Sequence, residues 1–210
     1  MKRKIIILVV TTLLIIGVTF LSWPIAALSS VWLKRVLAVL LNLTNGAIAF
    51  AAIKLTGINI DLDIKNYLQY LIGIGIALCL SLGIAFIPAL CGSSLVGSHQ
   101  DFSWETLLWS FFNFFFVIGP VEELIFRVYY QETFISFLNK NRWIGVLIAA
   151  FLFGWFHIIN GSLLQVAFTF GIGLVFGMCK FYIRNCKYLG LALGHGLYDF
   201  LNVIVRMFIV

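Results

Sequence analysis

Charged residues are scarce in this sequence, and their scarcity excludes an ordinary soluble protein. Only 10% of the 210 residues are charged, against roughly 25% in soluble domains. Hydrophobic residues make up 62% of the chain, and the mean hydropathy is +1.09. The longest polar connections between apolar runs have about a dozen residues, so no separate soluble domain can be recognised.

Apolar runs near or above the roughly 20 residues needed to cross a bilayer recur along the chain. They predict an all-α fold, a polytopic transmembrane bundle of about seven to eight helices that forms one integral membrane unit. Residues 121–138 are expected to add a further helical stretch. The expected apolar helices are 5–22, 32–53, 67–90, 104–119, 143–160, 163–182 and 188–208.

Recognisable ligand spacings and a concentrated basic surface are also missing. The four cysteines show no CxxC spacing, which favours small apolar residues over disulfide partners or metal ligands. The net charge of +6 does not predict nucleic-acid binding, because Lys and Arg are scattered at the ends of apolar runs. We interpret them as topology signals, with residues 2–4, 140–142 and 180–187 inside and the Lys- and Arg-free loop 92–103 outside.

This topology requires residues 104–138 to cross the membrane a net single time. A straight helix of that length would run about 52 Å at 1.5 Å per residue, too long for one span. Gly119 and Pro120 are therefore expected to break or kink it, and a re-entrant or interfacial path is the alternative. Pro120 also suits a first helical turn, which would put Glu122 and Glu123 near a helix amino end.

Ionisable residues inside apolar spans are costly, and each is a candidate for function. Glu123 and Arg127 are separated by four residues, so they share a helix face and predict an ion pair. Glu122 points to a different face and is the candidate general base. The alternative is a buried ion-pair network without chemistry.

A hairpin around the NKNR turn gives Glu122 a partner. If residues 121–138 and 143–160 are antiparallel helices, Glu122 lies about 16 residues before the turn and His157 about 15 after it. The two side chains would then lie at the same depth. A lone histidine on an apolar helix is more often a core residue, but one level with a glutamate favours a site.

His195 and Asp199 are again separated by four residues, so one helix can hold a carboxylate against an imidazole. The alternative is close helix packing with an incidental polar pair, because small residues surround the histidine. These small residues are Gly190, Ala192, Gly194 and Gly196.

Three motifs therefore follow one another on successive apolar stretches: EELIFR at 122–127, FGWFH at 153–157 and HGLYD at 195–199. They resemble the EExxxR, FxxxH and HxxxN/D motifs of the CPBP family of intramembrane proteases. That family includes CaaX prenyl proteases and the bacteriocin-processing and self-immunity proteins labelled Abi. The resemblance covers about residues 115–205.

The resemblance implies a glutamate-dependent endopeptidase whose site lies within the bilayer. Glu122 with His157 would activate a water for attack on a peptide carbonyl, and His195 with Asp199 would stabilise the oxyanion. Where family members carry Asn at the last motif position, its amide can donate a hydrogen bond, which an ionised Asp199 cannot. We therefore expect Asp199 to orient His195, unless Asp199 is protonated.

The same resemblance gives Glu123, Arg127 and Phe153 structural roles. It also divides the chain functionally, with residues 101–210 as the catalytic core and residues 1–100 as N-terminal transmembrane helices that match only in being hydrophobic.

Zinc is the rival chemistry, since two histidines and two or three carboxylates suit a zinc site with an open position. The HExxH spacing is absent, so we favour a metal-free mechanism and expect no cofactor. The expected partners are a peptide or membrane-protein substrate and the lipid bilayer, with no nucleic acid. Prenylated CaaX tails, secreted precursors and signalling peptides are all open as substrates.

A function of a different class is also open: a non-proteolytic membrane regulator or bacteriocin self-immunity protein that uses the same cavity for binding. A proton-coupled transporter is less favoured, because no inverted repeat relates the two halves. The favoured location is a bacterial cell membrane, in which the protein is a multi-pass integral membrane protein.

Overall fold

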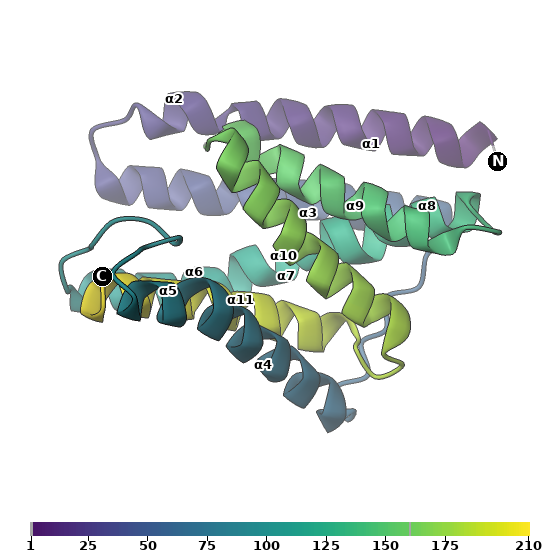
Figure 1. Ribbon diagram of the computed structural model, residues 1–210. Helices are drawn as coiled ribbons and strands as arrows, with labels where there is room; N and C mark the ends of the chain where they lie inside the picture. The colour runs from purple at the N-terminus through teal and green to yellow at the C-terminus, as the bar shows by residue number, and fades with distance from the viewer. Residues whose placement is uncertain (1, 160) are drawn as a thin grey trace. The chain divides into compact units, whose positions relative to one another are not determined.

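The computed structural model describes residues 2–159 and 161–210, and all regular structure in this part is helical. The described residues form seven helical segments (Figure 1), which confirms the predicted all-α bundle. The segments are α1 (Lys2–Phe20) with α2 (Ser22–Ala26); α3 (Val31–Thr56); α4 (Tyr67–Ser81) with η1 (Leu82–Phe86) and α5 (Ile87–Leu90); α6 (Trp104–Asn113), η2 (Phe114–Ile118), α7 (Gly119–Glu123), η3 (Leu124–Tyr130) and α8 (Gln131–Phe137); α9 (Arg142–Phe156) with η4 (His157–Ile159); α10 (Leu163–Tyr182); and α11 (Tyr188–Phe208).

Five of these helices are long and apolar enough to cross a membrane, and the protein is an integral membrane protein. Helix α9 is apolar as well but shorter. The five candidate spans are Lys2–Ala26, Val31–Thr56, Tyr67–Leu90, Leu163–Tyr182 and Tyr188–Phe208.

Packing divides the chain into two compact units, each built from two separate stretches. The first unit contains Met1–Asp61 and Val121–Arg184, and the second contains Leu62–Pro120 and Asn185–Val210. This division follows packing alone. The functional boundary expected between residues 100 and 101 stays a prediction.

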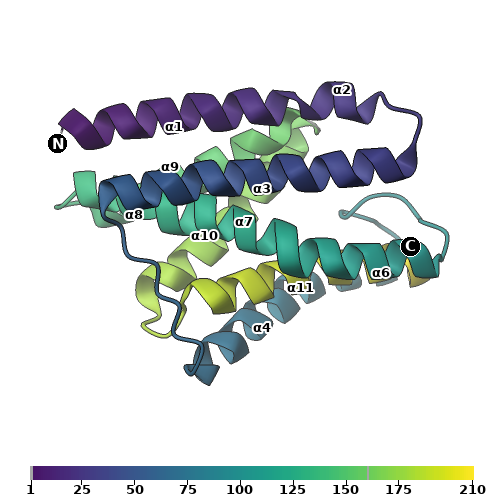
Figure 2. The same cartoon turned by 180° about the vertical axis from the view of Figure 1, so that it is seen from behind.

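In the first unit, α1 and α3 run antiparallel and side by side, as Figure 1 and Figure 2 both show. One face of α3 packs against η3. A Cβ at Gly46 on that face would lie only 3.1 Å from Val121 Cγ2, so glycine lets α3 approach the residue that precedes Glu122. The buried face of α3 consists of Asn45, Gly46, Ala49, Ala52, Ile53 and Thr56.

The predicted hairpin between residues 121–138 and 143–160 is present in the first unit as far as residue 159, and α8 packs against α9. Residue 160 lies outside the described residues. At the turn end, a Cβ at Gly145 would lie 2.7 Å from the Ile135 nitrogen, so the backbones nearly touch. Farther along, the Phe126 and Phe153 rings meet edge to face with centroids 5.1 Å apart. These contacts fix the antiparallel register of the two helices.

In the second unit, α4 and α11 pack through glycines. A Cβ at Gly190 would collide with the Gln69 carbonyl, and one at Gly194 would lie 2.5 Å from the Gly73 carbonyl oxygen. Gly196 has the same relation to η2, where a Cβ would lie 2.7 Å from the Phe114 carbonyl oxygen. The close backbone approach expected from these small residues is confirmed.

We expect Gly73→Ala to destabilise the second unit by roughly 1–3 kcal/mol, the usual cost of adding atoms to a packed core. The new methyl group would meet the Gly190 carbonyl, and a backbone atom cannot rotate away. Gly75→Ala on the same helix is the matched control, because nothing lies within 4 Å of a Cβ there. Unfolding by SDS in mixed micelles measures the difference, and equal stability of the two variants would contradict this packing.

Of the break or kink expected at Gly119 and Pro120, the break does not occur, because the chain is helical from Trp104 to Phe137. The five-residue π-helical stretch η2 directly precedes this pair, and the Gly119 N–H bonds to the Phe114 carbonyl five residues back. A wider turn accommodates a proline, which lacks an N–H and crowds the preceding turn. Glu122 therefore lies well inside a helix, and its predicted place near a helix amino end is wrong.

Candidate active site

The first unit holds the first two motifs, and their most buried members form an ion pair. Glu123 and Arg127 are both fully buried at 0% exposure. Arg127 Nε lies 3.4 Å from Glu123 Oε2, as the four-residue spacing predicted. The Arg127 guanidinium also lies over the Phe153 ring, 4.7 Å from its centroid. The side chains of Glu123, Arg127 and Phe153 are therefore all part of the packed interior.

Glu122 differs from its neighbour in exposure, because it is half-buried where Glu123 is fully enclosed. Arg127 pairs directly with Glu123, the glutamate four positions before it, as the spacing predicted.

His157 follows α9 directly and has a defined orientation. Its Nδ1 lies 2.8 Å from the Phe153 carbonyl oxygen, and its ring meets the Phe153 ring at 4.9 Å. A carbonyl oxygen only accepts, so Nδ1 carries the proton in this hydrogen bond. In the neutral imidazole the lone pair is then on Nε2, which makes Nε2 the available base or acceptor.

The hairpin register relates Glu122 to His157. Arg127 stacks on Phe153 and Gly145 packs against Ile135, so position 127 is opposite 153 and position 135 is opposite 145. Continuing this antiparallel register brings position 122 level with position 158, next to His157. The expectation of similar depth thus rests on two contacts within the first unit.

The third motif lies in the second unit, on α11. His195 is buried, and its Nε2 lies 3.6 Å from Asp199 Oδ2, an ion-pair distance that is too long for a good hydrogen bond. The Asp199 side chain retains 23% exposure. Gly194 and Gly196 on either side of the histidine hold α11 against other backbones.

Glu132, a further glutamate of the motif-bearing helical segment, forms an ion pair. Glu132 is paired with Lys180 of α10, which accounts for this glutamate without chemistry. Within each unit, the described residues include no group of three or more His, Cys, Asp or Glu side chains that could hold a metal ion. The sequence did not indicate a role for Tyr188. Its hydroxyl donates a hydrogen bond to the Pro120 carbonyl at 3.1 Å within the second unit.

Comparison with known protein families gives a match to the carboxy-terminal part of the chain. Residues 104–201 match the family model described as Type II CAAX prenyl endopeptidase Rce1-like. The matched region includes all three motifs and confirms the resemblance to CPBP and CAAX proteases. No curated protein and no solved structure gives a significant match. Residues 104–201, just under half of the chain, are thus similar to this family of proteases.

Proposed function

We propose that the protein is an intramembrane endopeptidase that hydrolyses a peptide bond of a membrane-associated or secreted-peptide precursor in a bacterial cell membrane. The family match supports a CAAX-type endopeptidase in general. The observation that carries the finer proposal is the contrast between two adjacent glutamates. Glu123 is enclosed with Arg127, whereas Glu122 is half-buried and can receive a proton from a reactant.

In this proposal Glu122 and His157 hold the attacking water between them. The Glu122 carboxylate and His157 Nε2 both accept hydrogen bonds, so one water donates a hydrogen to each and turns its lone pairs to the substrate. Glu122 takes one proton as the water oxygen bonds to the peptide carbonyl carbon. The same proton then passes to the leaving amine, and the C–N bond breaks.

His195 and Asp199 act on the developing oxyanion in the same proposal. His195 is the donor in this proposal, because an ionised Asp199 can only accept. The Asp199 carboxylate, 3.6 Å from His195 Nε2, orients the ring. A donor in a site with little water stabilises the developing oxyanion strongly.

We propose that no metal takes part. Zinc sites use at least three protein ligands, catalytic sites included. The HExxH spacing is absent, and neither unit offers a cluster of three such side chains among its described residues. We therefore expect treatment with 1,10-phenanthroline to leave the cleavage rate unchanged. A loss that added zinc restores would contradict the metal-free mechanism.

Cleavage by the purified, liposome-reconstituted protein tests the proposal. Two internally quenched probes cover two substrate classes: a farnesylated CaaX peptide and an unprenylated precursor peptide with a double-glycine leader. We expect hydrolysis of one of them, with the products identified by mass spectrometry. Binding of a probe without cleavage would contradict the peptidase and favour a non-proteolytic regulator or immunity protein.

A further inference from the structure

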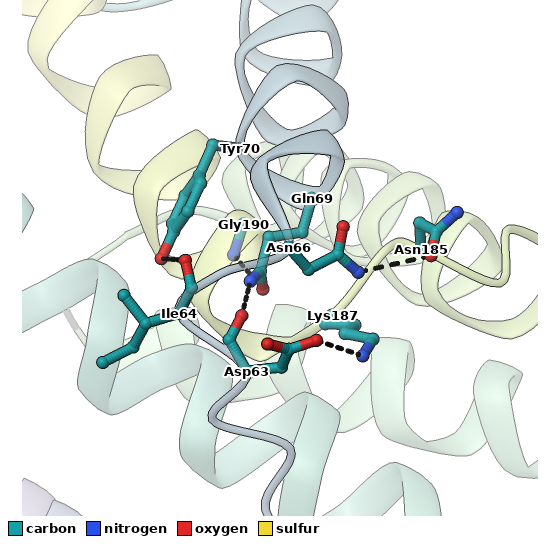
Figure 3. Close-up of polar contacts among 8 residues, drawn as sticks. All are labelled: Asp63, Ile64, Asn66, Gln69, Tyr70, Asn185, Lys187 and Gly190. Atoms are coloured by element: carbon teal, nitrogen blue, oxygen red, sulfur yellow. Dashed lines mark hydrogen bonds and ion pairs between the residues drawn. The ribbon is translucent and has the colours of Figure 1, made fainter.

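The amino end of α11 is capped by a side chain from another helix. The N-cap residue Lys187 makes no capping hydrogen bond through its side chain. Instead, the Gly190 N–H donates to Gln69 Oε1 of α4 at 3.2 Å (Figure 3). The first N–H groups of a helix have no partner within it, so Gln69 satisfies a buried donor of α11.

Gln69 is itself held in one orientation. Its side chain is fully buried, and Nε2 donates to the Asp63 carbonyl at 2.6 Å. The Gly190 N–H can only donate and the Asp63 carbonyl can only accept, so the amide cannot be flipped without losing both bonds. A polar side chain enclosed at the start of an apolar span is costly unless its hydrogen bonds are made.

Two further contacts join the same segments (Figure 3). Asn66 Nδ2 donates to Asn185 Oδ1 at 3.2 Å, and Lys187 Nζ lies 3.4 Å from Asp63 Oδ2. Both pairs connect the chain just before α4 to the chain just before α11. The start of α11 is therefore fixed to the start of α4 at several points, with Gln69 at the buried centre.

This anchor lies close to His195 along α11. His195 lies five positions after Gly190, which is about 7.5 Å along the helix at 1.5 Å per residue. Over this stretch α11 packs directly against the α4 backbone. Gly190 and Gly194 of α11 both lie against Gly73 of α4. Backbones in direct contact leave no layer of side chains to absorb a shift, so a displacement at the anchor is passed to the histidine.

We propose that Gln69 is a positioning residue for the reaction, which fixes the axial position of α11 and thereby of His195 and Asp199. This inference rests on the proposed endopeptidase function. Gln69 lies outside residues 104–201 that match the family, so it assigns to an N-terminal transmembrane helix a part in placing the catalytic groups.

Steady-state kinetics of Gln69 variants test this role with the cleaved probe. Gln69→Met keeps the length of the side chain and removes both hydrogen bonds. We expect kcat to fall by up to about 100-fold, as for a misplacement near 1 Å, with KM little changed. Gln69→Glu keeps an acceptor for the Gly190 N–H and should recover part of the rate.

A double-mutant cycle separates positioning from general destabilisation. In a His195→Ala background, Gln69→Met should cause little further loss, because its effect acts through the missing histidine. The matched control is Gln131→Met, which removes a buried hydrogen bond to the Gly177 carbonyl at 3.1 Å in the first unit. Its effect should be the same in both backgrounds. Equal losses for Gln69→Met in both backgrounds, or no loss, would overturn the proposal.

Hydrogen exchange distinguishes failure of the anchor from failure of the enzyme. The Gly190 amide should exchange slowly in the wild type and faster in Gln69→Met, whatever the protein cleaves. Unchanged exchange would overturn the anchor itself. If the wild type cleaves neither probe, the proposed function fails and the positioning role fails with it, while the exchange data still show whether Gln69 caps α11.

Discussion

Glu122→Gln is expected to lower kcat/KM for peptide cleavage by about 10²- to 10⁴-fold, the usual contribution of a positioned general base. The amide has nearly the shape of the carboxylate but cannot take a proton from water. Glu122 is half-buried whereas Glu123 is fully enclosed beside Arg127, so the change at Glu122 should cost less stability than the same change at Glu123. The rate is measured with the cleaved probe in liposomes, and folding is checked by SDS unfolding.

Glu123→Gln is the matched control, since it makes the same chemical change one residue away. We expect this variant to reduce the folded fraction, because it leaves the buried Arg127 without its nearest carboxylate. The rate per folded molecule should stay within about an order of magnitude of wild type, well short of the general-base loss. Full activity of Glu122→Gln, or the opposite ranking of the two variants, would remove Glu122 from the base role.

Local spacing predicted the parts of the site that lie within one helix or one hairpin. Glu123 and Arg127 meet because residues four apart share a helix face. The hairpin around the polar NKNR turn was predicted as well, although the contact of Arg127 with Phe153 that it permits was not. Such contacts depend on helical geometry and on a short turn, both of which can be read from one sequence.

The continuous helix through Gly119 and Pro120 could not be read in this way. In a soluble protein a Gly-Pro pair commonly ends a helix, because water satisfies the released backbone groups. Here the π-helical turn before the pair keeps the backbone hydrogen bonds within the helix instead. The resulting π-helical stretches, η2 and η3, also shift the side-chain register from that of an α-helix.

The sequence did not predict the role of Gln69, because its hydrogen-bond partner lies far away along the chain. A glutamine at the start of an apolar run is a visible signal, but its partner Gly190 is 121 residues away. Nothing in the local pattern around either residue identifies the other. Long-range contacts of this kind follow from how whole helices pack, and here the glycines of α4 and α11 decide it.

Arg127→Met should give the largest loss of stability, about 3–5 kcal/mol, which is typical when one partner of a buried ion pair is removed. Glu123 would keep its charge in a fully buried position without the nearby guanidinium. Met fills similar space and can still contact the Phe153 ring, so lost packing contributes little. SDS unfolding in mixed micelles measures the change.

The double variant Glu123→Gln/Arg127→Met separates charge from shape. Replacing a buried ion pair by neutral groups of similar volume is often tolerated, so the double variant should be more stable than either single variant. It keeps Glu122 and His157, and recovered stability should bring recovered cleavage if the pair is only a scaffold. A stable double variant without activity would instead show that the buried pair takes part in the reaction.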